Sequence, residues 1–259
     1  MKKSTIYFKK SLKLNNPVMV VGLPGIGSVG SIVAEYLKSE LGAKKFATLY
    51  SPTFPHQAIM LPNGRFRFLS NRFYYVKNVN NKKGKEQRDL ILLVGDTQPL
   101  TTEGQYDVNE KIIRFFKMLG GTTIYTIAGY NTTETQTGAP RVFGVATDGK
   151  TIAELKQKKV IFGKATGMIY GASGMLIGFA KMHGIKGACI MGETAMIDYF
   201  DANSAKAVLS ILKDILSIDI SLDNIDKLRK ETQNLLKELE DVAKAQNAQQ
   251  SQERPTYIR

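Results

Sequence analysis

The chain has 259 residues, of which 43% are hydrophobic and 23% charged, and it carries a formal net charge of +13. This length is enough for one substantial core, while the sequence shows neither a run of about eighteen apolar residues that would span a bilayer nor the pattern of a signal peptide. A single cysteine, Cys189, excludes an internal disulfide and favours a reducing cytoplasm, and with only two histidines, His56 and His183, it excludes a Cys/His zinc site.

The positive charge lies before residue 221, because residues 221–259 hold seven basic and seven acidic side chains. Lysines gather in residues 2–13 and 82–85 but form no basic helix. A basic surface suits nucleic acid, an acidic protein partner or simple solubility. The scatter favours solubility or an acidic protein partner over nucleic-acid binding.

Apolar runs of strand length alternate along the chain with helical patterns. Strands are expected in an N-terminal segment and at residues 16–22, 44–52, 88–96, 122–130, 159–167 and 185–194, with a hairpin meander over 57–78 and a short strand before residue 148. Helices are expected at residues 28–42, 107–121, 151–159, 171–184 and 201–218. Repeated strand–helix units predict a three-layer α/β/α fold with a mainly parallel sheet.

Two of these segments carry local predictions. Asp107, with Glu110 three residues later, is the expected N-cap of the helix over 107–121. In the meander, the turn falls at Pro62-Asn63-Gly64, and part of its apolar side is expected from Phe66, Phe68, Tyr74 and Val76.

The C-terminal part differs from the rest of the chain. Apolar residues recur at helical spacing over 221–246 on an otherwise charged segment, and the last residues have no such period. The predicted organisation is therefore an α/β/α domain over 1–220, an amphipathic helix over 221–247 and a flexible tail over 248–259.

The stretch Gly25-Ile26-Gly27-Ser28-Val29-Gly30 has the spacing of the dinucleotide-binding fingerprint, between an expected strand and an expected helix. Glycines at a helix N-terminus suit a phosphate, but they also suit a tight strand–helix turn. The next strand region, "FATLYSPTFPHQ", offers no acidic residue for a ribose, and no Gly-Lys-Ser/Thr follows the loop. We therefore favour tight packing and predict no cofactor.

Other residues with catalytic chemistry do not form a set. Ser173 lies in "GASGM", which resembles a nucleophile elbow until Met175, and His183 follows too far along the same helix to act as its base. Asp96 and Glu103 follow the best strand, and Glu193 and Asp198 follow the last, where α/β ligand sites gather. They remain a weak hint, and we predict no catalytic or metal-binding residue and no enzymatic activity.

The ordered set of residues 18–37, 89–99, 124–132, 142–148 and 167–194 resembles the PAC2 family, the proteasome assembly chaperone family, and in particular its archaeal members. The resemblance spreads over roughly residues 5–217, most of the chain. It implies an α/β/α core, homo-oligomerisation and assistance in assembling proteasome α-subunits. Members have also carried a ligase label, for which this chain shows no supporting residue set.

The resemblance also implies a partner-binding C-terminus. Archaeal relatives of this kind dock a terminal hydrophobic–tyrosine–any motif into the proteasome α-ring, whereas this chain ends with Tyr257, Ile258 and Arg259. The tail is therefore either a docking segment with a free carboxylate or a frayed terminus. The predicted function is a homo-oligomeric, proteasome-binding chaperone; the alternative is a nucleotide- or small-molecule-binding enzyme that uses the glycine loop at 22–30.

Overall fold

The computed structural model of the chain describes residues 3–8, 12–79, 87–132, 138–163, 167–195, 200–225 and 227. The chain divides into two compact units, Met1–Leu222 and Asp223–Arg259, and the fold below is that of the first. The tail predicted over 248–259 lies outside the described residues, as does most of the helix predicted over 221–247. Within the described part, no helix is long and apolar enough to cross a membrane.

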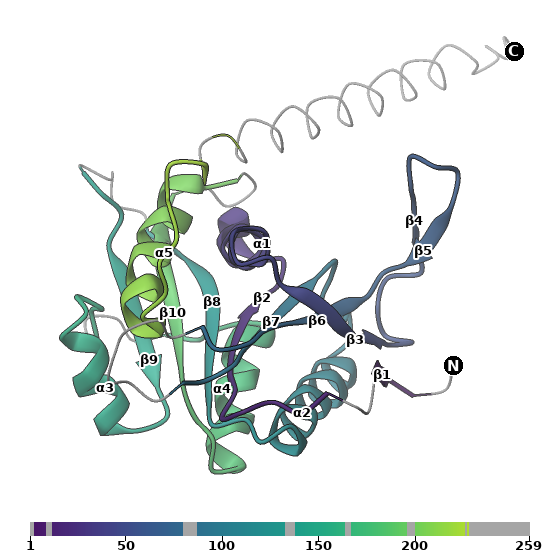
Figure 1. Cartoon of the computed structure of the whole chain (residues 1–259), viewed down its shortest axis with the longest axis horizontal. Coiled ribbons are helices and arrows are strands. Elements are labelled where there is room, and N and C mark those ends of the chain that lie inside the picture. Colours follow the sequence, from purple (N-terminus) through teal and green to yellow (C-terminus); the bar gives the residue numbers. More distant parts are fainter. Residues whose placement is uncertain are drawn as a thin grey trace, which may run out of the picture. The chain divides into compact units, whose positions relative to one another are not determined.

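Eight strands form one sheet in the order β1-β3-β6-β7-β2-β8-β10-β9 (Figure 1). Their bounds are Thr5–Phe8 (β1), Val18–Gly22 (β2), Lys44–Tyr50 (β3), Asn71–Val76 (β6), Leu90–Gly95 (β7), Thr123–Asn131 (β8), Val142–Ala146 (β9) and Lys186–Thr194 (β10). The central strands β7, β2, β8 and β10 run parallel. Antiparallel strands extend both sides of this centre: β6, β3 and β1 on one side and β9 on the other.

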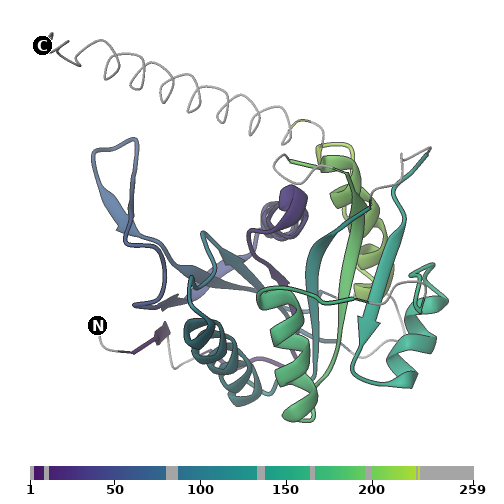
Figure 2. The ribbon, with the colours of Figure 1, turned by 180° about the vertical axis from the view of Figure 1, so that it is seen from behind.

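Helices cover both faces of the sheet, which confirms the three-layer α/β/α prediction (Figures 1 and 2). Their bounds are Val29–Glu40 (α1), Thr102–Met118 (α2), Gly149–Lys156 (α3), Ala172–Met182 (α4) and Ala202–Leu216 (α5). The helices α1 and α5 pack together on one face, and α2 and α4 pack together on the other. The short helix α3 packs beside β9 and β10.

The central strand β2 is buried over its whole length, as its continuous apolar run predicts. Side chains alternate between the two faces of a strand. Met19 and Val21 therefore point to the same face, where they join one apolar cluster with Ile112 of α2 and Leu176 of α4. This packing fixes the sheet under the helices and with it the loop that follows β2.

Two local predictions were wrong. The helix α2 begins at Thr102, because the Thr101 side chain caps it by accepting a hydrogen bond from the Gly104 amide at 3.0 Å, so Asp107 lies inside the helix instead of capping it. In the described part of the strand expected over 159–167, which is residues 159–163 and 167, the structure has an isolated bridge between Ile161 and Phe143 instead of a strand.

The predicted meander supplies β6 and a separate two-stranded hairpin, β4 (Ala58–Met60) and β5 (Phe66–Phe68). This hairpin projects beyond the edge of the large sheet (Figures 1 and 2). Phe66 is 68% exposed and Phe68 is 64% exposed, so the apolar side predicted for them does not face the core.

Candidate functional site

The glycine loop between β2 and α1 is held by close backbone contacts. A Cβ atom on Gly22 would lie 2.0 Å from the carbonyl oxygen of Gly30, and one on Gly30 would lie 2.7 Å from the carbonyl oxygen of Ile127 in β8. Real Cβ atoms essentially never come this close to backbone, so these two glycines allow α1 to pack onto β2 and β8. Gly27, with φ of 61°, allows the single turn of 3₁₀ helix (Ile26–Ser28) before α1.

Two backbone carbonyls of this loop accept hydrogen bonds from other parts of the chain or from the loop itself. The carbonyl of Gly25 accepts the Ser28 amide at 2.9 Å, and that of Gly27 accepts the Asp201 amide at 2.9 Å. The loop is thus locked to the start of α5 as well as to β8. This geometry favours the tight-packing interpretation of the glycine spacing.

A cavity of about 560 Å³ lies beside the loop. It is formed by residues 23–26, the end of β8 (127–131), part of β9 (143–145) and the segment before α4 (167–171). After β2 the chain builds β3, β6 and β7 on one side of β2, and it then crosses over to form β8 on the other side. The direction in which strands are added therefore reverses between β2 and β8. Such a switch point is where open α/β sheets bind ligands.

The lining of this cavity is uncharged. Among the described residues that form it, none is Asp, Glu, Lys or Arg, and the polar side chains include Gln98, Asn131 and Ser173. Gly25 faces open space, because a Cβ atom there would meet nothing within 4 Å. The described lining suits an uncharged apolar group better than a phosphate.

Gln98 ties the two sides of the cavity together. Its Nε2 donates to the carbonyl of Pro24 at 2.6 Å, and its Oε1 accepts the Ala172 amide at 2.8 Å. The first amide of α4 is therefore capped by a side chain 74 positions earlier in the chain. No local sequence pattern indicates this contact, and we did not predict it.

Ser173 and His183 lie at opposite ends of α4 and both have structural partners. The Ser173 hydroxyl donates to the carbonyl of Ile127 at 3.2 Å. His183 Nε2 lies 3.0 Å from Glu110 Oε1 of α2. Burial alone would raise the pKa of Glu110, but hydrogen bonds from Arg114 and His183 outweigh it and lower that pKa. Since α4 rises ~1.5 Å per residue, these residues do not form a catalytic pair.

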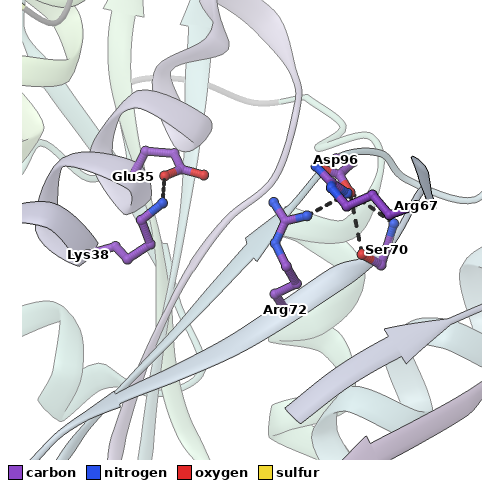
Figure 3. A network of polar contacts seen from close by, with 6 residues as sticks. All are labelled: Glu35, Lys38, Arg67, Ser70, Arg72 and Asp96. Atoms are coloured by element: carbon purple, nitrogen blue, oxygen red, sulfur yellow. Dashed lines mark hydrogen bonds and ion pairs between the residues drawn. The ribbon is translucent and has the colours of Figure 1, made fainter. Parts of the chain in front are cut away.

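Asp96, at the end of β7, belongs to an ion-pair network (Figure 3). Both of its oxygens accept from the Arg67 guanidinium, Oδ2 also accepts from Arg72 at 2.9 Å, and the Ser70 amide donates to Oδ2 at 3.0 Å. Burial alone would raise the pKa of Asp96, but these hydrogen bonds and charges lower it.

The sheet topology makes Asp96 the acidic residue whose position corresponds to the ribose-binding acid of a dinucleotide site. The parallel neighbour of β2 on this side is β7, not β3, which is the next strand in the chain. A ribose-binding acid would therefore follow β7. Asp96 stands there, but its oxygens are engaged by Arg67 and Arg72. Glu103 lies apart from this network, exposed in the first turn of α2.

Glu193 and Cys189 on β10 also have structural roles. The Arg141 guanidinium and amide both donate to Glu193, which lowers the pKa of that carboxyl. Burial raises the pKa of the Cys189 thiol to about 11. Asp198, the predicted neighbour of Glu193, lies outside the described residues. Among the described residues, no group of three or more His, Cys, Asp and Glu side chains is placed to hold a metal ion.

His56 lies exposed in the loop before β4, where it lines a second pocket, described below. The partner-binding residues predicted at the C-terminus, Tyr257, Ile258 and Arg259, lie outside the described residues. The described side chains considered for catalysis are thus dispersed, and several of them are engaged in structural contacts.

Comparison with known proteins identifies the class to which this fold belongs. The model of the PAC2 family matches residues 19–243, so the chain belongs to the PAC2 family, as its sequence resemblance predicted. It is 31% identical over 250 residues to the uncharacterized protein MJ1210 of Methanocaldococcus jannaschii, covering 95% of this chain and 93% of that protein.

Among solved structures, the chain is similar to Pyrococcus furiosus PbaB, described as an archaeal proteasome activator. The two share 38% identity with a TM-score of 0.81, over 93% of this chain and 100% of PbaB. P. furiosus PbaA, described as an archaeal homolog of proteasome-assembly chaperone, matches with a TM-score of 0.73 and 23% identity over 99% of this chain and 100% of PbaA. That second likeness concerns the fold alone.

Proposed function

We propose that this chain is a non-catalytic protein of the proteasome assembly-chaperone kind, which works in the cytoplasm as a homo-oligomer. Its partner is the proteasome, through isolated α-subunits or the α-ring. The observation that carries this proposal is the 38% identity to the archaeal proteasome activator PbaB over the whole of that chain. The structural engagement of Asp96, Ser173 and Glu193 described above supports it.

In this proposal the C-terminal residues Tyr257, Ile258 and Arg259 form a docking element. An aromatic side chain followed by a free carboxylate suits capture between subunits that present apolar pockets and lysines. An oligomer carries several such tails, so that weak single contacts add up through avidity.

The test uses purified proteasome and the full-length protein. We expect binding, measured by surface plasmon resonance, to weaken about tenfold or more in Tyr257→Ala and on deletion of 251–259. Thr256→Ala is the matched control and should bind like the wild type. Full-length protein that binds neither α-subunits nor the assembled particle would overturn the function, whereas unchanged binding by the deletion would remove only the tail from it.

The cavity beside Gly25 supports one alternative, a nucleotide- or small-molecule-binding protein. Its position at the switch point favours a ligand, although its described lining is uncharged. Gly25→Val is a suitable probe, because the new side chain meets open space and no backbone. Calorimetry with ATP, ADP and NAD decides: submillimolar binding that this substitution abolishes would revive the alternative.

A further inference from the structure

The hairpin β4–β5 has one apolar face that is open to solvent. Cross-strand pairing places Ala58 opposite Phe68 and Met60 opposite Phe66, so these four side chains share one face. Met60 is 88% exposed, and the rings of Phe66 and Phe68 lie edge to face at 6.2 Å. We call these four residues the hairpin face. A two-stranded ribbon is at best marginally stable alone, and an exposed apolar face of this kind marks an interaction site.

The opposite face of the hairpin is anchored to the sheet. Ile59 and Arg67 point there, half-buried, and Arg67 is bound through both Asp96 oxygens to the end of β7. Asp96 itself is bound to Arg72 of β6 (Figure 3). The ion pairs therefore fix the direction of the ribbon.

A pocket of about 820 Å³ lies at the base of the hairpin. Its apolar lining includes Tyr7, Tyr50, Phe54, Pro55, Ala58 and Phe68. Ala58 and Phe68 belong both to this base pocket and to the hairpin face, so the two form one continuous apolar surface. A ridge beside a hollow on one surface is self-complementary, which is what a two-fold contact between identical chains requires.

Charge distinguishes a second copy of this chain from a different, acidic partner. Each copy carries a net charge of +13, so two copies repel overall, and a contact between them is least unfavourable at a surface that holds no cations. Among the residues that the structure describes, the base pocket and the hairpin face contain no Asp, Glu, Lys or Arg. An acidic partner would instead be matched by cations, but the two on the hairpin, Arg65 and Arg67, alternate with Phe66 and so lie on its other face, where Arg67 is paired with Asp96.

We propose that the hairpin face and base pocket form a two-fold interface between copies of this chain, in which the ridge of each copy occupies the base pocket of the other. This inference rests on the homo-oligomer of the proposed function and adds the surface that makes it. The hairpin face is the energetic centre of the contact, since a few buried aromatic side chains dominate most interfaces.

The first test measures mass by light scattering after size-exclusion chromatography. The double variant Met60→Ser/Phe66→Ser is expected to weaken self-association about 100-fold. The control Met118→Ser/Met182→Ser changes side chains on α2 and α4 that are 60% and 79% exposed, and it should keep the wild-type mass. A monomeric wild type, or a double variant that assembles like the wild type, would overturn the inference.

The second test is disulfide formation between mixed single-cysteine variants. Met60→Cys in one copy should cross-link with Gln57→Cys at the base pocket of another, in preference to either variant with itself. Cys189 is fully buried and does not interfere. Cross-linking no better than that of Met182→Cys would contradict the contact. Proteasome binding, measured separately, distinguishes failure of this interface from failure of the proposed function.

Discussion

The cavity at the glycine loop and the pocket at the base of the hairpin are both apolar hollows, but different forces hold their walls. The first depends on backbone-to-backbone contact at Gly22 and Gly30, which only the absence of a side chain allows. The second depends on a projecting ribbon whose direction is set by Arg67 and Asp96. A close backbone contact cannot make room for an added side chain, whereas an ion pair is weakened by a change of pH or by the loss of one charged group. The two regions should therefore fail in different ways.

The largest effect is expected at the glycine loop. Even the single methyl group of Gly22→Ala would lie 2.0 Å from the Gly30 carbonyl oxygen, so we expect a loss of about 3 kcal/mol in the free energy of unfolding. Gly25→Ala, in the same loop but facing open space, should change it by less than about 0.5 kcal/mol. Urea titration monitored by circular dichroism measures both. Equal stability of the two variants would show that close packing does not define this loop.

The hairpin should be weakened by the loss of one charge. In Asp96→Asn, Arg67 and Arg72 lose their carboxylate, and we expect the protein to be destabilised by about 2 kcal/mol. The ribbon should also detach locally, so that limited proteolysis cuts within residues 58–68 sooner than in the wild type. Asp107→Asn, an exposed residue inside α2, is the matched control and should do neither. Unchanged proteolysis of Asp96→Asn would mean that packing, not the ion pair, sets the direction of the hairpin.

The pH dependence follows from the same group. Because the pKa of Asp96 is lower in the folded protein than its ordinary value, its stabilising effect is fully present above the unfolded pKa and is lost as the pH falls through the folded pKa. The stability difference between wild type and Asp96→Asn should therefore shrink once the pH drops below about 4. Thermal unfolding of both proteins from pH 7 to pH 3 checks this, and a difference that stays constant would contradict it. The comparison with Asp96→Asn is needed because Glu110 and Glu193, whose pKa values are also lowered, add acid sensitivity to both proteins.

The same contrast explains which features the sequence predicted. Strands, helices and their layers follow from apolar periodicity, which is local. The packing role of the glycine loop was inferred because no acidic residue for a ribose follows in the next strand region and no Gly-Lys-Ser/Thr follows the loop. The partners of charged and polar groups are not local: Arg67 and Asp96 are 29 positions apart, and Gln98 and Ala172 are 74 apart. One sequence gives no means of pairing such distant residues.

The sequence predicted the turn and the apolar side of the hairpin, but not that this side is open to solvent. Phe66 and Phe68 alternate with polar residues as in a strand with one buried face, and the pattern does not say what covers that face. The turn was predicted well, whereas the solvent exposure of its apolar side depends on how far the hairpin projects beyond the large sheet. Thr101, the true cap of α2, lies six residues before Asp107, where the predicted helix begins. The sequence alone does not distinguish a capping pattern inside a longer helix from the N-terminus of a helix.

The smallest effects distinguish the two regions best, because the same type of substitution, Gln to Leu, can be made once in each region. Gln98→Leu removes the bonds to Pro24 and Ala172 beside the glycine-loop cavity, and it should cost about 1 kcal/mol of stability without changing self-association. Gln57→Leu enlarges the apolar surface of the base pocket, and it should leave the stability of the dilute protein unchanged while tightening self-association about threefold. Denaturant unfolding at a concentration too low for assembly, together with sedimentation across a concentration series, measures the two quantities independently. If Gln98→Leu altered assembly, or Gln57→Leu altered only stability, the division between a locked loop and a docking hairpin would be wrong.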